Sequence, residues 1–198
     1  MILDAEMVKQ LRDITGAGFL DCKKALIETE GNLDKAAELL RQKGLTQALK
    51  KMARETKSGI IEAYIHHDRQ VGVILELNCE TDFVARTDEF KNLAKEISLQ
   101  ITAMSPIYIS REDVPVEEIE KEKALFEAQA RESGKPAQVI EKIALGKLED
   151  YFKNICLLEQ PYVKDGSKKI VDLIKDVITK TGENITLRKF VRMKVNED

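Results

Sequence analysis

The fold of this chain is indicated most clearly by one stretch, residues 60–79, which reads IIEAYIHHDRQVGVILELNC. Apolar side chains alternate along it in two runs, separated by the polar residues 67–70. An alternation of period two places apolar residues on one face of a β-strand. We therefore predict two paired strands, over residues 60–66 and 71–79. The alternating residues are Ile61, Ala63 and Ile65 in the first run and Val71, Val73, Leu75 and Leu77 in the second.

The C-terminal stretch 184–195 predicts a third, long strand of the same antiparallel sheet. Its apolar series is Ile185, Leu187, Val191, Met193 and Val195. Two stretches with helical spacing flank the strands. Thr87 can cap a helix over 88–103 that buries Phe90, Leu93, Ala94, Ile97 and Ile101, and Ser167 can cap a helix over 168–181 that Gly182 ends. Three strands make a single small sheet, with too few strands for a second layer to cover it. We therefore expect these helices to pack on one face of the sheet, which gives an α+β fold.

Residues 1–44 predict three short helices. The segment 15–18 separates the first from the second, and Gly31 ends the second. Asn32 can cap the third helix, which we expect to end before Gly44. The charged connection 50–59 follows. We therefore predict a small three-helix domain over 1–50 and a core domain over 51–198.

A helical hairpin over residues 112–155 is expected to protrude from the core domain. Pro115 begins a helix with an apolar stripe at spacings of three and four, the segment 133–136 breaks it, and a return helix follows. The outward faces of both helices are heavily charged. An ordinary hairpin packed in the core is the alternative.

Composition excludes several classes of protein. The 198 residues include 43% hydrophobic and 34% charged residues, with a net charge of −3. No apolar run approaches the roughly 20 residues that span a bilayer. The first residues, 1–6, form no apolar signal-peptide segment, so we expect a soluble, cytoplasmic protein. No segment is basic enough to indicate a nucleic-acid surface.

The residues that usually carry catalysis are sparse. Cys22, Cys79 and Cys156 form no C-x-x-C pair, which favours free buried thiols. The only histidines, His66 and His67, are adjacent in a predicted strand and point to opposite faces. Phosphate-loop, dinucleotide and nucleophile-elbow motifs are absent from the sequence. We therefore expect neither an enzyme nor a bound cofactor or metal.

Two groups of residues are candidates for partner binding. Thr81, Asp82, Phe83 and Val84 follow a hydrophobic strand. In the simplest interpretation Asp82 caps a turn and Phe83 fills the core; an exposed Phe83 beside a carboxylate would instead be a binding anchor. The second group surrounds the turn after the first helix. It comprises the cations Lys9, Arg12, Lys23 and Lys24 and the apolar Phe19 and Leu20.

Three stretches of the chain resemble a known family. Residues 8–26, VKQLRDITGAGFLDCKKAL, and 75–85, LELNCETDFVA, closely resemble the two signatures of bacterial elongation factor Ts. The segments 133–136 and 158–163 are similar to that family's coiled-coil return and following loop. Phe19-Leu20 stands where some members carry two methionines.

This resemblance implies that the chain is a nucleotide-exchange factor for elongation factor Tu. It implies binding both to GDP-bound Tu and to nucleotide-free Tu. It implies that the N-terminal module resembles a ubiquitin-associated fold and docks on Tu through Lys9, Arg12, Phe19, Leu20 and Lys23. Thr81, Asp82, Phe83 and Val84 would disturb the Mg²⁺ site of Tu, with Phe83 entering between Tu helices. The chain resembles the short form with one core half, which implies a homodimer that carries two Tu molecules. No position matches the histidine that longer members supply from the second half.

Two other functions remain open from the residues alone. A ubiquitin-binding adaptor would use residues 1–44 but leaves the sheet without a role. A metal-dependent hydrolase would use Glu76, Glu80 and Asp82, of which the last two share a strand face.

Overall fold

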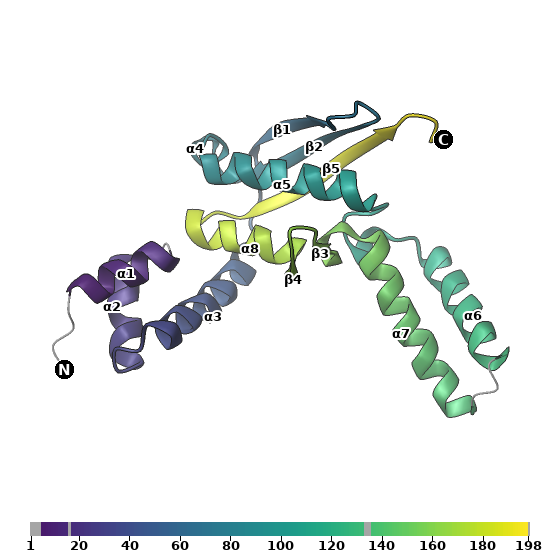
Figure 1. The fold of residues 1–198 in the computed structure, drawn as a ribbon, viewed down its shortest axis with the longest axis horizontal. Coiled ribbons are helices and arrows are strands. Elements are labelled where there is room, and N and C mark those ends of the chain that lie inside the picture. The colour runs from purple at the N-terminus through teal and green to yellow at the C-terminus, as the bar shows by residue number, and fades with distance from the viewer. Residues whose placement is uncertain (1–4, 16, 133–135, 198) are drawn as a thin grey trace. The chain divides into compact units, whose positions relative to one another are not determined.

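A computed structural model of the chain describes residues 5–15, 17–132 and 136–197 (Figure 1). Helices and a small antiparallel sheet are mixed along the chain, as expected of an α+β fold. In chain order the elements are α1 Ala5–Thr15, α2 Phe19–Glu28, α3 Leu33–Lys51, β1 Ser58–Ile65, β2 Val71–Cys79, α4 Asp82–Ala85, α5 Asp88–Met104, the 3-10 turn η1 Arg111–Asp113, α6 Val116–Glu132, α7 Ala137–Ile155, the 3-10 turn η2 Leu157–Glu159, β3 Pro161–Tyr162, β4 Asp165–Lys169, α8 Ile170–Thr181 and β5 Ile185–Lys194.

The chain divides into two compact units. The first contains the described residues up to Gly59 together with Asn78–Phe90 and Ile174–Thr186. The second contains Ile60–Leu77, Lys91–Leu173 and the residues from Leu187 onward. The first unit therefore combines segments that are far apart in the sequence.

The N-terminal helices of the first unit have a small core of their own. Its fully buried side chains are Val8, Leu11, Cys22, Ala25, Leu26 and Ala36. Asn32 caps α3 as predicted, because its Oδ1 accepts a hydrogen bond from the Lys35 backbone N–H at 3.0 Å. Gly31 has φ = 85°, a left-handed conformation that glycine adopts at no steric cost.

The prediction that the third helix ends before Gly44 is wrong. Helix α3 continues through Gly44 to Lys51. Gly44 is buried, and a Cβ atom at this position would lie 2.6 Å from Cγ2 of Thr179 at the end of α8. The glycine therefore permits a close approach between α3 and α8. It does not end the helix, because an interior glycine costs only about 1 kcal/mol relative to alanine.

The sheet of the second unit has the strand order β1-β2-β5 (Figure 1). The His66 N–H donates to Val71 O at the hairpin turn, and the Val195 N–H donates to Gln70 O at the end of β5. Val73, Leu75 and Leu77 of β2 are buried, and α5 lies alongside the sheet (Figure 1). The inner face of α5 is confirmed, since Phe90, Leu93, Ala94, Ile97 and Ile101 are all buried.

The predicted alternation of the last strand is only partly correct. Ile185 and Leu187 are buried, but Val191, Met193 and Val195 are exposed. Two consecutive exposed residues, Arg188 and Lys189, interrupt the period-two pattern. Beyond this point Phe190 and Arg192 are less exposed than Val191 and Met193, so the alternation continues with the opposite parity.

Helices α6 and α7 pack along each other as a helical pair (Figure 1). At their base Phe152, Leu148 and Ile155 form a buried cluster with Val114 and Cys156. The predicted break at 133–136 lies outside the described residues except for Pro136. The coiled-coil character and the protrusion of this pair stay predictions.

The predicted cap of the last long helix is wrong. Ser167 lies in β4, which pairs with β3, and its hydroxyl donates to Asp165 Oδ1 at 2.6 Å. The start of α8 is held instead by Asp172, whose Oδ2 accepts from the Lys169 backbone N–H at 3.0 Å. Gly182 follows α8 with φ = 79°, as expected of a glycine that ends a helix. Within the described ranges, no helix is long and apolar enough to cross a bilayer.

Candidate partner-binding site

The residues Thr81–Ala85 form a short turn between β2 and α5, here called the Phe83 turn. Helix α4 supplies four of its residues. Phe83 is 78% exposed, whereas Val84 and Ala85 are buried. The interpretation in which Phe83 fills the core is therefore wrong. The turn is anchored by its last two side chains and presents a phenyl ring to solvent.

Asp82 is also exposed on this turn. Its carboxylate accepts a hydrogen bond from Nη2 of Arg86 at 2.7 Å, one helical turn later. Both side chains are more than half exposed, so the ion pair contributes little to stability. Asp82 does not cap the turn; Thr81 is the residue at the N-cap position.

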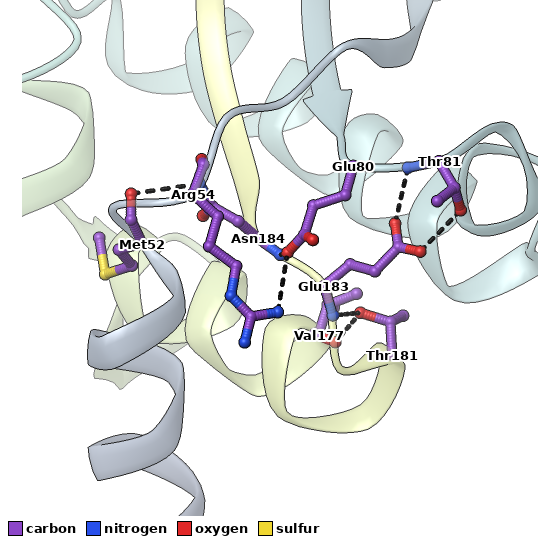
Figure 2. A network of polar contacts seen from close by, with 8 residues as sticks. All are labelled: Met52, Arg54, Glu80, Thr81, Val177, Thr181, Glu183 and Asn184. Carbon is purple, nitrogen blue, oxygen red and sulfur yellow. Dashed lines mark hydrogen bonds and ion pairs between the residues drawn. The ribbon is translucent and has the colours of Figure 1, made fainter.

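Thr81 is held by a carboxylate from the far end of the chain. Its backbone N–H donates to Glu183 Oε2 at 2.9 Å, and its hydroxyl donates to Glu183 Oε1 at 2.6 Å (Figure 2). The Thr81 carbonyl accepts from the thiol of Cys79 at 3.1 Å. Burial raises the pKa of the Cys79 thiol to about 11, so it stays protonated and remains a donor at neutral pH.

A second contact joins the same two segments, with the acceptor carboxylate on Glu80 and the donor N–H on Asn184. Oε1 of Glu80 accepts from the Asn184 backbone N–H at 2.7 Å and lies 3.5 Å from Nη1 of Arg54 (Figure 2). The fully buried side-chain amide of Asn184 donates to Met52 O at 3.2 Å and to Arg54 O at 2.6 Å. Glu80, Thr81, Glu183 and Asn184 are here called the clasp. Sequence analysis missed Glu183, Asn184 and Arg54, because no local pattern relates positions more than 100 residues apart.

The N-terminal candidates all lie on the surface of the three-helix module. Phe19 is 52% exposed and Leu20 is 68% exposed, both in the first turn of α2. Lys9 and Arg12 of α1 and Lys23 of α2 are exposed as well, as is Lys24. Two apolar residues that the sequence analysis left out, Ile14 and Ile27, are also exposed.

The carboxylates of the hydrolase alternative do not form a metal site. Among the described residues, no three His, Cys, Asp or Glu side chains come close enough to hold a metal ion. Each of the three carboxylates has a cationic neighbour instead. These pairs are Glu76 with Arg188, Glu80 with Arg54 and Asp82 with Arg86.

The chain also matches known proteins over most of its length. The family model "Elongation factor TS" matches residues 33–197. The chain belongs to the elongation factor Ts family. Elongation factor Ts of Fervidobacterium nodosum is 55% identical over 197 residues, and that of Coprothermobacter proteolyticus is 56% identical over 197 residues. In both comparisons the alignment covers 100% of each chain.

The family match covers the Phe83 turn and the clasp. It begins at Leu33 and leaves out α1 and α2, whereas the full-length relatives align over these helices too. Elongation factor Ts of Thermotoga maritima is 53% identical over 100% of this chain and 98% of its own length. Members of the same length therefore occur in the family. Membership assigns the chain to translation elongation and protein biosynthesis.

Proposed function

We propose that this chain promotes the release of GDP from elongation factor Tu by disturbing its Mg²⁺ and phosphate site. The observation that carries the proposal is the 78% exposure of Phe83 on a turn whose first backbone N–H, that of Thr81, is bonded to Glu183. An exposed aromatic side chain beside a carboxylate has the chemistry of an interface anchor, because aromatic residues carry a large share of the binding energy at protein interfaces. Members of the family are expected to work without covalent chemistry, and the proposal requires none.

The mechanism follows from linkage. A protein that binds nucleotide-free Tu more tightly than nucleotide-bound Tu weakens nucleotide binding by the same factor. Mg²⁺ neutralises the phosphate charge in such GTPases. A phenyl ring between close-packed helices changes their spacing, because protein interiors have few voids. Movement of the Mg²⁺ ligands then weakens the hold on GDP.

Stopped-flow release of fluorescent GDP from Tu tests this function. Tu with the labelled nucleotide is mixed with excess unlabelled GDP, with and without this chain. The release rate is expected to rise with the concentration of this chain and then to saturate. An unchanged rate at every concentration would contradict the proposal.

We further propose that the three-helix module docks on Tu. It exposes the apolar Phe19 and Leu20 and also the cations Lys9, Arg12 and Lys23. Deletion of residues 1–50 is expected to leave a folded body and to raise the concentration of this chain at half-saturation of GDP release. Loss of a cooperative unfolding transition in the shortened chain would contradict the domain boundary.

A two-fold homodimer that carries two Tu molecules is the third part of the proposal. The sheet has two edges, β1 and β5, and each of its three strands exposes large apolar side chains. These exposed side chains are Ile61 and Ile65 of β1, Ile74 of β2 and Val191 and Met193 of β5. A second copy would cover them with the same side chains, since a two-fold interface is self-complementary.

Light scattering tests this assembly. We expect two copies of each protein in the complex, and Met193→Glu is expected to reduce it to one of each. A charge buried in an apolar interface is costly, whereas pairing through the strand edges would tolerate it. A one-to-one complex of the unaltered chain at micromolar concentration would contradict the dimer.

A further inference from the structure

We propose that Glu183 is a positioning residue that holds the Phe83 turn in the orientation needed for nucleotide release. This inference rests on the proposed function and names a residue that acts on the turn from the opposite end of the chain. Glu183 does not belong to the Thr81–Val84 segment and is separated from it by about 100 residues of sequence.

The Phe83 turn has little to fix it locally. Helix α4 has only four residues, and its largest side chain, Phe83, is exposed and adds no burial. A single helical turn is unstable alone, because several dihedral angles are fixed for each hydrogen bond gained. The hydroxyl of a threonine at the N-cap ordinarily accepts a bond from the backbone of the helix. Here the Thr81 hydroxyl donates to Glu183 instead.

Glu183 takes two donors from the same residue. Each of its carboxylate oxygens accepts one bond from Thr81, at 2.9 Å from the N–H and 2.6 Å from the hydroxyl. Bonds to a charged acceptor are stronger than neutral ones, and two of them fix an orientation as well as a distance. The pair thus sets the direction in which the backbone leaves β2 and enters α4.

Glu183 is itself held in place. Its backbone N–H lies 3.4 Å from the Thr181 hydroxyl, and that hydroxyl donates to Val177 O of α8 at 2.9 Å (Figure 2). The next residue, Asn184, bonds to Glu80 through its N–H and to the carbonyls of Met52 and Arg54 through its side chain. The clasp therefore fixes the Phe83 turn to the end of α8 and to the segment that follows α3.

This arrangement separates docking from release. The docking candidates lie on α1 and α2, whereas the Glu183 carboxylate bonds to Thr81 at the start of the turn that carries Phe83. Loss of the Glu183 contact should leave the docking surface unchanged. It should let the Phe83 ring adopt several orientations, of which few enter the partner.

The test compares Glu183→Gln, Thr81→Val and Thr81→Ser in the full-length chain. Glu183→Gln and Thr81→Val are each expected to slow GDP release at saturation about tenfold, since the first removes the charge from the acceptor of both bonds and the second removes the hydroxyl donor. The concentration at half-saturation should stay within about twofold. Thr81→Ser keeps the hydroxyl and should release GDP at the normal rate.

Two comparisons separate positioning from a loss of folding. The double variant should be no slower than the slower single variant, because both changes break the same contact. Glu55→Gln is the matched control: Glu55 lies in the same unit, is highly exposed and pairs only at the surface with Lys57. A normal saturating rate for Glu183→Gln, or additive effects in the double variant, would overturn the inference.

Amide hydrogen exchange provides a readout without Tu. Glu183→Gln should speed exchange at residues 81–85 while the amides of α1–α3 keep their protection. If the unaltered chain fails to release GDP, the proposed function is wrong, and hydrogen exchange still decides whether Glu183 holds the turn. Unchanged exchange at residues 81–85 would overturn the positioning role in either case.

Discussion

Two phenylalanines seven residues apart meet opposite environments. Phe83 on α4 is 78% exposed, and Phe90 in the first turn of α5 is fully buried. The two segments are neighbours in the chain and both are helical. Burial here therefore depends on how each segment is held, and not on residue type.

The two segments are fixed in different ways. Helix α5 has a complete apolar face and is capped by Thr87, whose hydroxyl oxygen accepts from the Phe90 N–H at 3.3 Å. The Phe83 turn buries only Val84 and Ala85 and relies on a hydrogen bond donated by Cys79 and on bonds accepted by Glu183. Apolar burial positions the first segment and polar contacts position the second, which leaves the Phe83 side chain free for a partner.

The largest expected effect contrasts Phe90→Ala with Phe83→Ala. Phe90→Ala should lower the free energy of unfolding by about 3–5 kcal/mol, because it leaves a cavity in the core. Phe83→Ala should change it by less than about 0.5 kcal/mol, as exposed substitutions usually do. Denaturant unfolding of both variants measures the difference.

In the GDP-release assay the same two variants should rank in the opposite order, with Phe83→Ala affected more than Phe90→Ala. Phe83→Ala is expected to slow GDP release far more than it weakens Tu binding, whereas folded Phe90→Ala should retain release. A large loss of stability in Phe83→Ala together with a normal saturating rate would return Phe83 to a structural role.

The sequence predicted α5 well, and the reason is local. A helix with one apolar face repeats every three to four residues, so its inner residues can be identified without knowing what covers them. The cap at Thr87 is equally local. The exposure of Phe83 was left open, because a single aromatic residue after a strand has no periodicity to interpret.

The sequence pattern is a poor guide where distant segments of the chain meet. Gly44 looked like a helix end, but its small size serves contact with Thr179. The alternation of β5 is interrupted at Arg188 and Lys189, two consecutive exposed residues that the apolar pattern of the sequence does not mark. The bonds between Glu183 and Thr81 join positions that no spacing rule connects.

A smaller effect is expected for Asp82→Ala, which tests whether the carboxylate itself acts on the partner. We expect slower GDP release with nearly unchanged stability, because Asp82 is exposed and its ion pair with Arg86 is weak. Arg86→Ala breaks the same ion pair and keeps the carboxylate. Equal slowing in both variants would show that the ion pair, and not a contact of Asp82 with Tu, is what matters.

The smallest expected effect concerns Cys79, whose buried thiol donates a hydrogen bond to the Thr81 carbonyl of the Phe83 turn. Burial raises the pKa of this thiol from 9.0 to about 11, with the nearby Glu183 carboxylate as the next cause. The folded chain therefore keeps a proton that the unfolded chain loses. Stability from this group is complete below about pH 9 and is lost as pH rises through about 11.

Denaturant midpoints between pH 8 and pH 11 measure this dependence, with Cys79→Ala and Cys156→Ala compared against the unaltered chain. Burial also raises the pKa of Cys156 to about 11, but Cys156 lies in the cluster at the base of α7. Both variants should flatten the alkaline decline in stability.

Amide exchange separates the two thiols. Only ionisation of Cys79 removes the donor to the Thr81 carbonyl, so faster amide exchange at residues 81–85 should appear at alkaline pH in Cys156→Ala as in the unaltered chain. In Cys79→Ala that exchange should already be fast at neutral pH and, after correction for the intrinsic rate, should not change further with pH. Slow, protected exchange in Cys79→Ala would mean that Glu183 alone fixes the turn.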